Sequence, residues 1–309
     1  MEKESNFVSA VLYLHNAEGT ARGFLECVCG VLARHFLKYE VVCVNDASDD
    51  RTAAEVREFA AEHPGAPVTI LHMSYFQGRE LAMNAGMDLA IGDFVFEFDV
   101  PVCDFDPELI FGVYQRALEG YDIVGAHAEG RTRASSGLFY AVYNRFSGSP
   151  YKLTTESFRV LSRRAINRVH SMTKTIPFRK AVYANCGLKL DSLPYRPTRE
   201  CAKDRQDNAF RRGLAVDSLM LFTDIAYKFA FGMTLLMILA TVFVAVYAIA
   251  VFLTGAPVEG WTTTMLFLAF CFFGVFAVLT IVLKYMTLLI DLTFKKAKYT
   301  FESIEKLSR

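Results

Sequence analysis

Two long uncharged apolar segments near the C-terminus constrain the fold of this chain more than any other sequence feature. Residues 229–254 and 262–283 contain no Asp, Glu, Lys or Arg. Each is longer than the roughly 20 residues that an α-helix needs to cross the hydrocarbon core of a bilayer. The short connector contains Gly, Pro and Trp, which suit a turn at a membrane surface. The sequence therefore predicts a transmembrane helical hairpin over residues 227–290; the alternative is a buried hairpin of a water-soluble protein.

Basic residues flank this predicted hairpin on both sides and are absent from its connector. They are Lys203, Arg205, Arg211, Arg212 and Lys228 before it, and Lys284, Lys295, Lys296, Lys298, Lys306 and Arg309 after it. Because basic flanks tend to stay in the cytoplasm, we expect a multi-pass protein of a bacterial-type inner membrane, with both termini and the N-terminal domain cytoplasmic. The first residues lack the apolar core of a signal peptide, which agrees with that expectation.

Composition excludes several other classes of protein. The chain has 33 basic and 33 acidic residues, whereas nucleic-acid-binding domains usually carry a basic excess. A hydrophobic content of 53% is too high for a disordered chain. Seven cysteines are scattered without the paired spacing of a zinc site, so we expect reduced thiols in a cytosolic domain.

Residues 1–207 have the pattern of an α/β domain. Short apolar segments predict strands at 7–14, 39–44, 68–73, 94–98 and 121–125. They alternate with segments that predict helices at about 18–36, 51–62, 78–91 and 107–119. This alternation is typical of a mostly parallel, Rossmann-like sheet. Ligands of such sheets bind beyond the carboxyl ends of the strands.

Polar and acidic residues follow three of these predicted strands: Asn16 and Glu18; Asp46, Ser48 and Asp50; Asp99, Asp104 and Asp106. Helix capping accounts for Asp106 and can account for Asp50. It does not account for Asp46 and Asp99, which precede no predicted helix directly. Two carboxylates at one sheet edge suit a hard divalent cation that holds a diphosphate. Neither a dinucleotide-binding glycine motif nor a P-loop occurs.

Several motifs resemble those of a known family. Residues 8–16 and 44–52, Gly78-Arg-Glu80, residues 85–93 and Phe158-Arg-Val-Leu-Ser162 are similar to motifs of family 2 glycosyltransferases, which have the GT-A fold. Their order and the predicted hairpin are most similar to the polyprenyl-phosphate glycosyltransferases, such as dolichol-phosphate mannose synthase and its bacterial relatives. The resemblance thus implies a GT-A domain followed by a transmembrane hairpin.

The resemblance also implies a reaction and a set of site residues. A sugar would pass, with inversion, from a nucleotide-diphosphate sugar to a polyprenyl phosphate of the undecaprenyl type, for surface glycan assembly. A divalent cation, Mg²⁺ or Mn²⁺, and basic side chains would stabilise the departing diphosphate. The implied nucleotide-sugar site comprises Asn16, Glu18, Asp46, Ser48, Gly78, Arg79 and Asp99, with Asp46 at the base or ribose. Because Arg suits bidentate phosphate contacts, the acceptor-phosphate candidates are Arg131, Arg133, Arg159, Arg199 and Arg205.

The chain departs from the family pattern at its site motifs. Pro101 stands where the second Asp of the Asp-x-Asp motif is usual, and Cys103 replaces a Gln. Because Pro and Cys are poor ligands for Mg²⁺ or Mn²⁺, either Asp104 substitutes as a ligand or metal binding is weakened. Ser157 replaces an Asp before the Phe-Arg motif. The candidate catalytic residues are therefore Asp99, Asp104 and Ser157, and the candidate metal ligands are Asp99 and Asp104.

These departures leave two alternatives to the main hypothesis. One is a glycosyltransferase with a different lipid or glycan acceptor. The other is a non-catalytic GT-A homologue that acts as a partner in polysaccharide biosynthesis. Residues 208–226 predict an amphipathic juxtamembrane helix, with an ordinary domain helix as the alternative, and residues 291–309 predict a cytosolic basic tail. The resemblance suggests a homo-oligomer.

Overall fold

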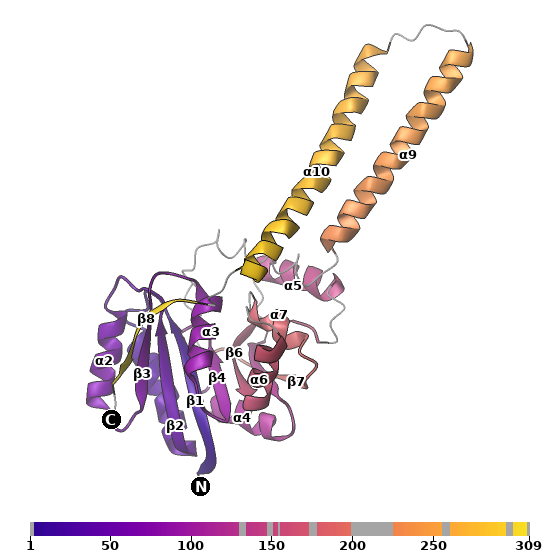
Figure 1. The fold of residues 1–309 in the computed structure, drawn as a ribbon. Helices are drawn as coiled ribbons and strands as arrows, with labels where there is room; N and C mark the ends of the chain where they lie inside the picture. The colour runs from indigo at the N-terminus through magenta and orange to yellow at the C-terminus, as the bar shows by residue number, and fades with distance from the viewer. Residues whose placement is uncertain are drawn as a thin grey trace. The chain divides into compact units, whose positions relative to one another are not determined.

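The computed structural model describes residues 3–129, 134–146, 151–153, 155–172, 178–198, 225–254, 260–294 and 299–307 (Figure 1). The chain divides into two compact units. The first comprises Met1–Leu214 with Lys296–Arg309, and the second comprises Ala215–Lys295. Most of the residues predicted to form a nucleotide-sugar site fall in the first unit.

The first unit is built on an eight-stranded sheet with the order β7-β5-β6-β4-β1-β2-β3-β8. The strands are β1 (Glu4–Leu14), β2 (Phe36–Asn45), β3 (Val68–Met73), β4 (Phe94–Phe98), β5 (Ile123–Ala128), β6 (Glu156–Ser162), β7 (Leu190–Tyr195) and β8 (Phe301–Lys306). Strand β1 pairs in parallel with β2 and β4, as do β2 with β3 and β5 with β7. Strands β6 and β8 run antiparallel to their neighbours. The predicted α/β sheet is therefore confirmed, with β6, β7 and β8 added, of which β6 and β8 are antiparallel.

Helices cover both faces of this sheet. They are α1 (Ala21–His35), α2 (Thr52–Glu62), α3 (Arg79–Leu89), α4 (Leu109–Leu118), α5 (Ala134–Phe146), α6 (Arg163–Met172) and α7 (Arg179–Ala184). The first helix begins later than predicted, because a turn comes before it in which Thr20 N donates to Ala17 O over 3.0 Å. Asp50 accepts from Thr52 N and Asp106 from Glu108 N, each over 3.0 Å, but the N-cap residues of α2 and α4 are Arg51 and Glu108.

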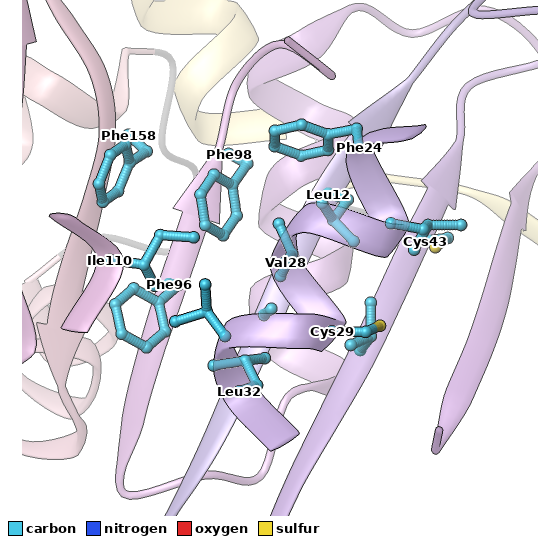
Figure 2. Close-up of a cluster of buried hydrophobic side chains, with 14 of the residues drawn as sticks. Leu12, Phe24, Val28, Cys29, Leu32, Cys43, Phe96, Phe98, Ile110 and Phe158 are labelled. Carbon is cyan, nitrogen blue, oxygen red and sulfur yellow. The ribbon is translucent and has the colours of Figure 1, made fainter. Parts of the chain in front are cut away.

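The main apolar core lies between the sheet and helices α1 and α4. Figure 2 shows Leu12, Phe96 and Phe98 of the sheet beside Val28 and other residues of α1. Successive side chains of a strand point to opposite faces, so this face takes alternate residues of each strand. Burial of a side chain of this size contributes about 1.5–3 kcal/mol.

The opposite face packs closely against α3. A Cβ atom built on Gly86 would overlap Val11 Cγ1 and lie 2.6 Å from Val44 Cγ2. Glycine therefore lets the helix approach β1 and β2. A cavity of about 10 Å³, lined by residues of α3, β6, α6 and α7 that include Leu161 and Tyr183, shows that these helices share this face. Polar residues of β4 and β6 also point here, as described below.

Strand β8 lies within residues 291–309, the segment predicted as a cytosolic basic tail. Residues 301–306 pair antiparallel with β3, and Arg57 Nη2 lies 2.9 Å from Glu305 Oε2. Thr300 N also donates to Gln77 Oε1 over 3.0 Å. The segment covers the edge of β3, which would otherwise expose unpaired backbone groups. Its basic character obscured a strand pattern in the sequence.

The second unit contains the two predicted apolar helices, α9 (Ile225–Thr254) and α10 (Trp261–Phe294). They contact each other where Gly274 meets Met237, whose Sδ lies 3.0 Å from a Cβ built on the glycine. When only the described residues are considered, neither these nor other helices are long and apolar enough to cross a membrane. The predicted helix at 208–226 lies outside the described residues, apart from its last two, which begin α9.

Candidate functional site

The loops after β1 and β2 are joined by hydrogen bonds at the carboxyl edge of the sheet. Asn16 N donates to Ser48 Oγ over 3.1 Å, and Asp49 N donates to Asn16 Oδ1 over 2.9 Å. Asn16 has a φ of 48°, a left-handed conformation that Asn tolerates better than most residues. Glu18 joins the same two loops, because Glu18 Oε2 accepts from Arg51 N over 3.3 Å. Three predicted site residues, Asn16, Glu18 and Ser48, therefore lie together.

An open depression of about 490 Å³ lies between these loops. Its lining residues are Asn16, Glu18, Asp49 and Asp50. Carboxylate and amide oxygens of this kind accept hydrogen bonds from hydroxyl and N–H groups. The depression can therefore bind a neutral polar group such as a ribose or a base, whereas its three carboxylates would repel a phosphate.

Asp46 has a different role from the predicted contact with a base or ribose. Its carboxylate is buried and accepts from Gln77 N and Gly78 N, each over 2.9 Å, and from Tyr13 Oη over 3.1 Å. Burial raises the pKa of Asp46, and these hydrogen bonds offset the rise only in part. In this structure Asp46 thus fixes the backbone at residues 77–78. Gly78 has a φ of 83° there, which glycine adopts without strain.

Arg79 is positioned by this arrangement. It is the first residue of α3, directly after the backbone that Asp46 holds, and its guanidinium lies 5.6 Å from the centre of the Tyr13 ring. Tyr13 belongs to β1, which lies between β2 and β4. Because the chain order of the strands reverses at β1, this edge is the switch point at which ligands of open α/β sheets bind. Arg79 is therefore a cation at the expected binding position.

Asp99, directly after β4, lies inside a buried ion-pair network. Its Oδ1 is 2.6 Å from Nη2 of Arg179, and its Oδ2 is 3.2 Å from Nη2 of Arg159. Both arginines are 1% exposed. Burial alone would raise the pKa of Asp99, but the charges of Arg179, Arg159, Lys180 and Arg79 outweigh it and hold the pKa below its usual range. Asp99 is thus held as an anion by protein cations.

Three further carboxylates complete this network. Arg159 contacts Glu97 over 2.8 Å and Glu156 over 2.9 Å. Arg179 contacts Glu80 over 3.1 Å and Glu97 over 3.0 Å. Arg159, a predicted acceptor-phosphate residue, thus has three carboxylates of the protein around its guanidinium. The other four arginines predicted for that role, Arg131, Arg133, Arg199 and Arg205, lie outside the described residues.

Sequence reasoning missed Glu80, Glu97 and Arg179 as site residues. Glu97 gives a signal that could have been found, because it interrupts the apolar strand Phe94-Val-Phe-Glu-Phe98 at a position that is fully buried. A buried carboxylate requires a partner, and Arg159 stands opposite it across the sheet. Arg179 gives no comparable signal, because it stands beside another basic residue, Lys180, at the start of a short helix.

Asp104 and Ser157 are brought together through Tyr195. Tyr195 Oη donates to Asp104 Oδ1 over 2.8 Å, and the hydroxyls of Ser157 and Tyr195 are 2.5 Å apart. Since the Tyr195 proton goes to Asp104, Ser157 donates to Tyr195. This chain of hydrogen bonds holds the loop after β4 against β6 and β7. Both predicted catalytic residues therefore face a tyrosine that the sequence did not suggest.

The residues present do not fit the predicted divalent-cation site on Asp99 and Asp104. Both oxygens of Asp99 contact guanidinium groups, and Tyr195 occupies one oxygen of Asp104. Pro101 offers no side-chain ligand. Within the ranges that the structure describes, no group of three or more His, Cys, Asp or Glu side chains is placed to hold a metal ion.

Comparison with known proteins identifies the first unit. Residues 9–171 match the family model described as glycosyl transferase family 2. An uncharacterized glycosyltransferase of Synechocystis sp. is 28% identical over 59% of this chain and 58% of its own length. An undecaprenyl-phosphate 4-deoxy-4-formamido-L-arabinose transferase of Edwardsiella ictaluri is 29% identical over 57% of this chain and 56% of its own. The chain thus spans less than two thirds of either relative.

A solved structure resembles the chain over a larger share of its length. It is a mannosyltransferase from Pyrobaculum calidifontis in complex with GDP-Man and Mn²⁺, with a TM-score of 0.47 and 14% identity over 95% of this chain and 89% of that one.

Proposed function

The chain belongs to glycosyltransferase family 2, and we propose that it transfers a sugar from a nucleotide-diphosphate sugar to a polyprenyl phosphate, with inversion at the anomeric carbon. The observation that carries this proposal is the arrangement at the sheet's switch point. A polar depression lies beyond β1 and β2, and a cation, Arg79, lies 5.6 Å from the ring of Tyr13 near the end of β1. A nucleoside diphosphate has the matching order of groups, with polar neutral groups at one end and negative charge at the other.

The nucleoside would occupy the depression, and its diphosphate would extend toward Arg79. The ribose hydroxyls and base N–H groups can donate to Asn16, Glu18, Asp49 and Asp50. The diphosphate would avoid these carboxylates and lie on the β4 side of the depression. Arg79 is one of the cations that lower the pKa of Asp99 on that side. Charge that develops on the leaving diphosphate is stabilised by fixed cations at that position.

A named relative and the chemistry support the proposed acceptor. The relative from Edwardsiella ictaluri is named for transfer to undecaprenyl phosphate. An acceptor phosphate is already ionised, so its oxygen can attack the anomeric carbon without a general base. A bond forms between that oxygen and C1, and the bond between C1 and the diphosphate oxygen breaks. The Asp104–Tyr195–Ser157 group would position the sugar or the acceptor and would not remove a proton.

We further propose that residues 227–290, taken as a whole sequence, form a membrane hairpin that would bring the transferase unit to a lipid acceptor at the cytoplasmic face. The uncharged runs 229–254 and 262–283 support this. The described side chains that are exposed on both helices are mainly apolar, including Phe243 and Phe273. Association of such hairpins would give the homo-oligomer that the resemblance suggests.

Transfer of labelled sugar tests this function. The purified full-length chain in detergent is given radiolabelled nucleotide sugars with undecaprenyl phosphate, and label in the lipid phase is counted. We expect label in the lipid phase with at least one donor, and its loss in Arg79→Gln. Arg34→Gln, an exposed residue remote from the site, is the matched control. Transfer only to another acceptor would favour an altered-acceptor enzyme, and no transfer with any donor would contradict the proposal.

A further inference from the structure

We propose that fixed basic side chains around Asp99, with Arg79 facing the donor, replace the divalent cation in this chain, so that it binds nucleoside diphosphates without a metal. This inference rests on the proposed function, because it concerns the same donor site. It differs from the expectation of Mg²⁺ or Mn²⁺ that the family resemblance implies.

Asp99 already has two cationic partners within the protein. A carboxylate that ligates Mg²⁺ or Mn²⁺ must present an oxygen lone pair to the ion. Both oxygens of Asp99 are instead in contact with guanidinium groups of two buried arginines, over 2.6 Å and 3.2 Å. Arg179 is held there on three sides, because Glu80 and Glu97 bind its other nitrogen atoms. A metal ion bound to Asp99 would lie beside one of these two buried guanidinium charges, which would repel it.

The charged side chains around Asp99 are of both signs. Asp99, Glu97, Glu80 and Glu156 are the four carboxylates that the two buried arginines contact. Four basic side chains, Arg179, Arg159, Lys180 and Arg79, act on Asp99. These carboxylates therefore already have protein cations as partners, whereas a divalent-cation site needs an excess of anionic oxygen.

Arg79 has a fixed position at the start of α3. Asp46 accepts hydrogen bonds from the two backbone N–H groups just before Arg79. The guanidinium of Arg79 lies 5.6 Å from the centre of the Tyr13 ring. Arg79 also begins an α-helix of 11 residues, whose N-terminus carries a partial positive charge. A planar guanidinium in a fixed place binds a diphosphate through paired hydrogen bonds. Arg79 can therefore supply the charge compensation that a metal ion supplies in other sites.

Calorimetric titration of the purified full-length chain with UDP, GDP, CDP and ADP tests the inference. Each titration is run with EDTA and with Mn²⁺. We expect at least one nucleotide to bind with dissociation constants that agree within about twofold between the two conditions. In Arg79→Gln, the loss of a charge-assisted contact should weaken that binding about tenfold or more in EDTA. Arg34→Gln should leave it unchanged.

Electron paramagnetic resonance of Mn²⁺ provides a readout that is independent of activity. We expect the protein, with or without a nucleoside diphosphate, to leave the free Mn²⁺ signal unchanged beyond the effect of the nucleotide itself. Protein-dependent loss of the signal that disappears in Asp99→Asn would overturn the inference, as would nucleotide binding that requires Mn²⁺; both results would leave the proposed function intact. Failure of every nucleotide to bind in either buffer would overturn the proposed function, and this inference with it.

Discussion

Glu97 and Arg159 face each other across the antiparallel strands β4 and β6, and Arg159 Nη1 lies 2.8 Å from Glu97 Oε2. Both side chains are almost fully buried, on the sheet face opposite the main apolar core. The pair therefore links the one antiparallel strand inside the sheet to its parallel half. It also positions Asp99, since Arg159 contacts both carboxylates.

Replacement of Arg159 by Met should strongly destabilise the first unit. Arg159→Met would leave the carboxylates of Glu97, Asp99 and Glu156 with one cation fewer in a buried position. Removal of one partner from a buried ion pair typically costs about 3–5 kcal/mol. Urea unfolding of the purified chain measures this loss. Arg57→Gln, which breaks the exposed pair with Glu305, should cost about 1 kcal/mol or less. Equal losses of unfolding free energy in the two variants would contradict the claim that the buried ion pairs of Arg159 stabilise the first unit more than an exposed pair does.

Gly86 and Gly112 form a matched pair of helix glycines. In Gly86→Ala, the new methyl group would overlap Val11 and press on Val44, so we expect a loss of about 1–3 kcal/mol from overpacking. In Gly112→Ala, the methyl group of α4 would meet no atom within 4 Å. Alanine favours the helix there, so we expect a gain of up to about 1 kcal/mol. Changes in the free energy of unfolding that have opposite signs in the two variants would confirm the close approach of α3 to the sheet. Similar changes in both variants would refute it.

Much of the fold could be predicted from sequence, and the failures have physical causes. The strands at 68–73 and 94–98 were predicted with their observed bounds, because each is a short apolar run between polar residues. Strand β6 contains Glu156 and Arg159, whose charges hide a buried strand unless their partners are known. Strand β8 is mostly exposed at an edge and has no apolar run.

Part of the candidate site could likewise be predicted from the sequence, and part could not. Asn16, Glu18 and Ser48 could be placed together, because parallel strands end at one edge of a sheet. The partners of Asp99 could not be predicted, since Arg159 and Arg179 lie 60 and 80 positions away in the chain. Tertiary packing decides such ion pairs. A carboxylate in a metal motif and a carboxylate in an ion-pair network look the same in one sequence.

The pH dependence of stability should report Asp99. Its pKa is lower in the folded chain than the usual value of about 3.9 for an unfolded chain. The unfolded state therefore binds a proton first as the pH falls, so the contribution of Asp99 is complete above about pH 5 and is lost progressively below about pH 4.

Unfolding free energies between pH 6 and pH 3 measure this effect. Asp99→Asn should lower stability at neutral pH and reduce the slope on the acid side. Some slope should remain, because hydrogen bonds and ion pairs that outweigh burial also lower the pKa values of Asp50, Asp122 and Glu305. An unchanged slope in Asp99→Asn would contradict the ionised, paired state of Asp99.

Tyr195→Phe tests the link between Asp104 and Ser157. The variant keeps the ring but removes the hydroxyl that donates to Asp104 and accepts from Ser157. Loss of a buried hydrogen-bond partner costs about 1–3 kcal/mol. If the group positions the reacting sugar or acceptor, the transfer rate should fall by about tenfold or more while the nucleoside diphosphate affinity stays the same. A loss of nucleotide affinity equal to the loss of rate would place this group in the donor site instead.

The most direct test of the whole account is mass spectrometry of the lipid after incubation with a nucleotide sugar. Full-length protein, undecaprenyl phosphate and the donor that binds in calorimetry are incubated in EDTA, and the lipid is then extracted. The account predicts a product with the mass of undecaprenyl phosphate plus one sugar residue, present with wild-type protein and depleted with Arg79→Gln. Unmodified lipid in EDTA, with product formed only after Mn²⁺ is added, would contradict metal-free donor binding. Unmodified lipid under both conditions would contradict the proposed transfer.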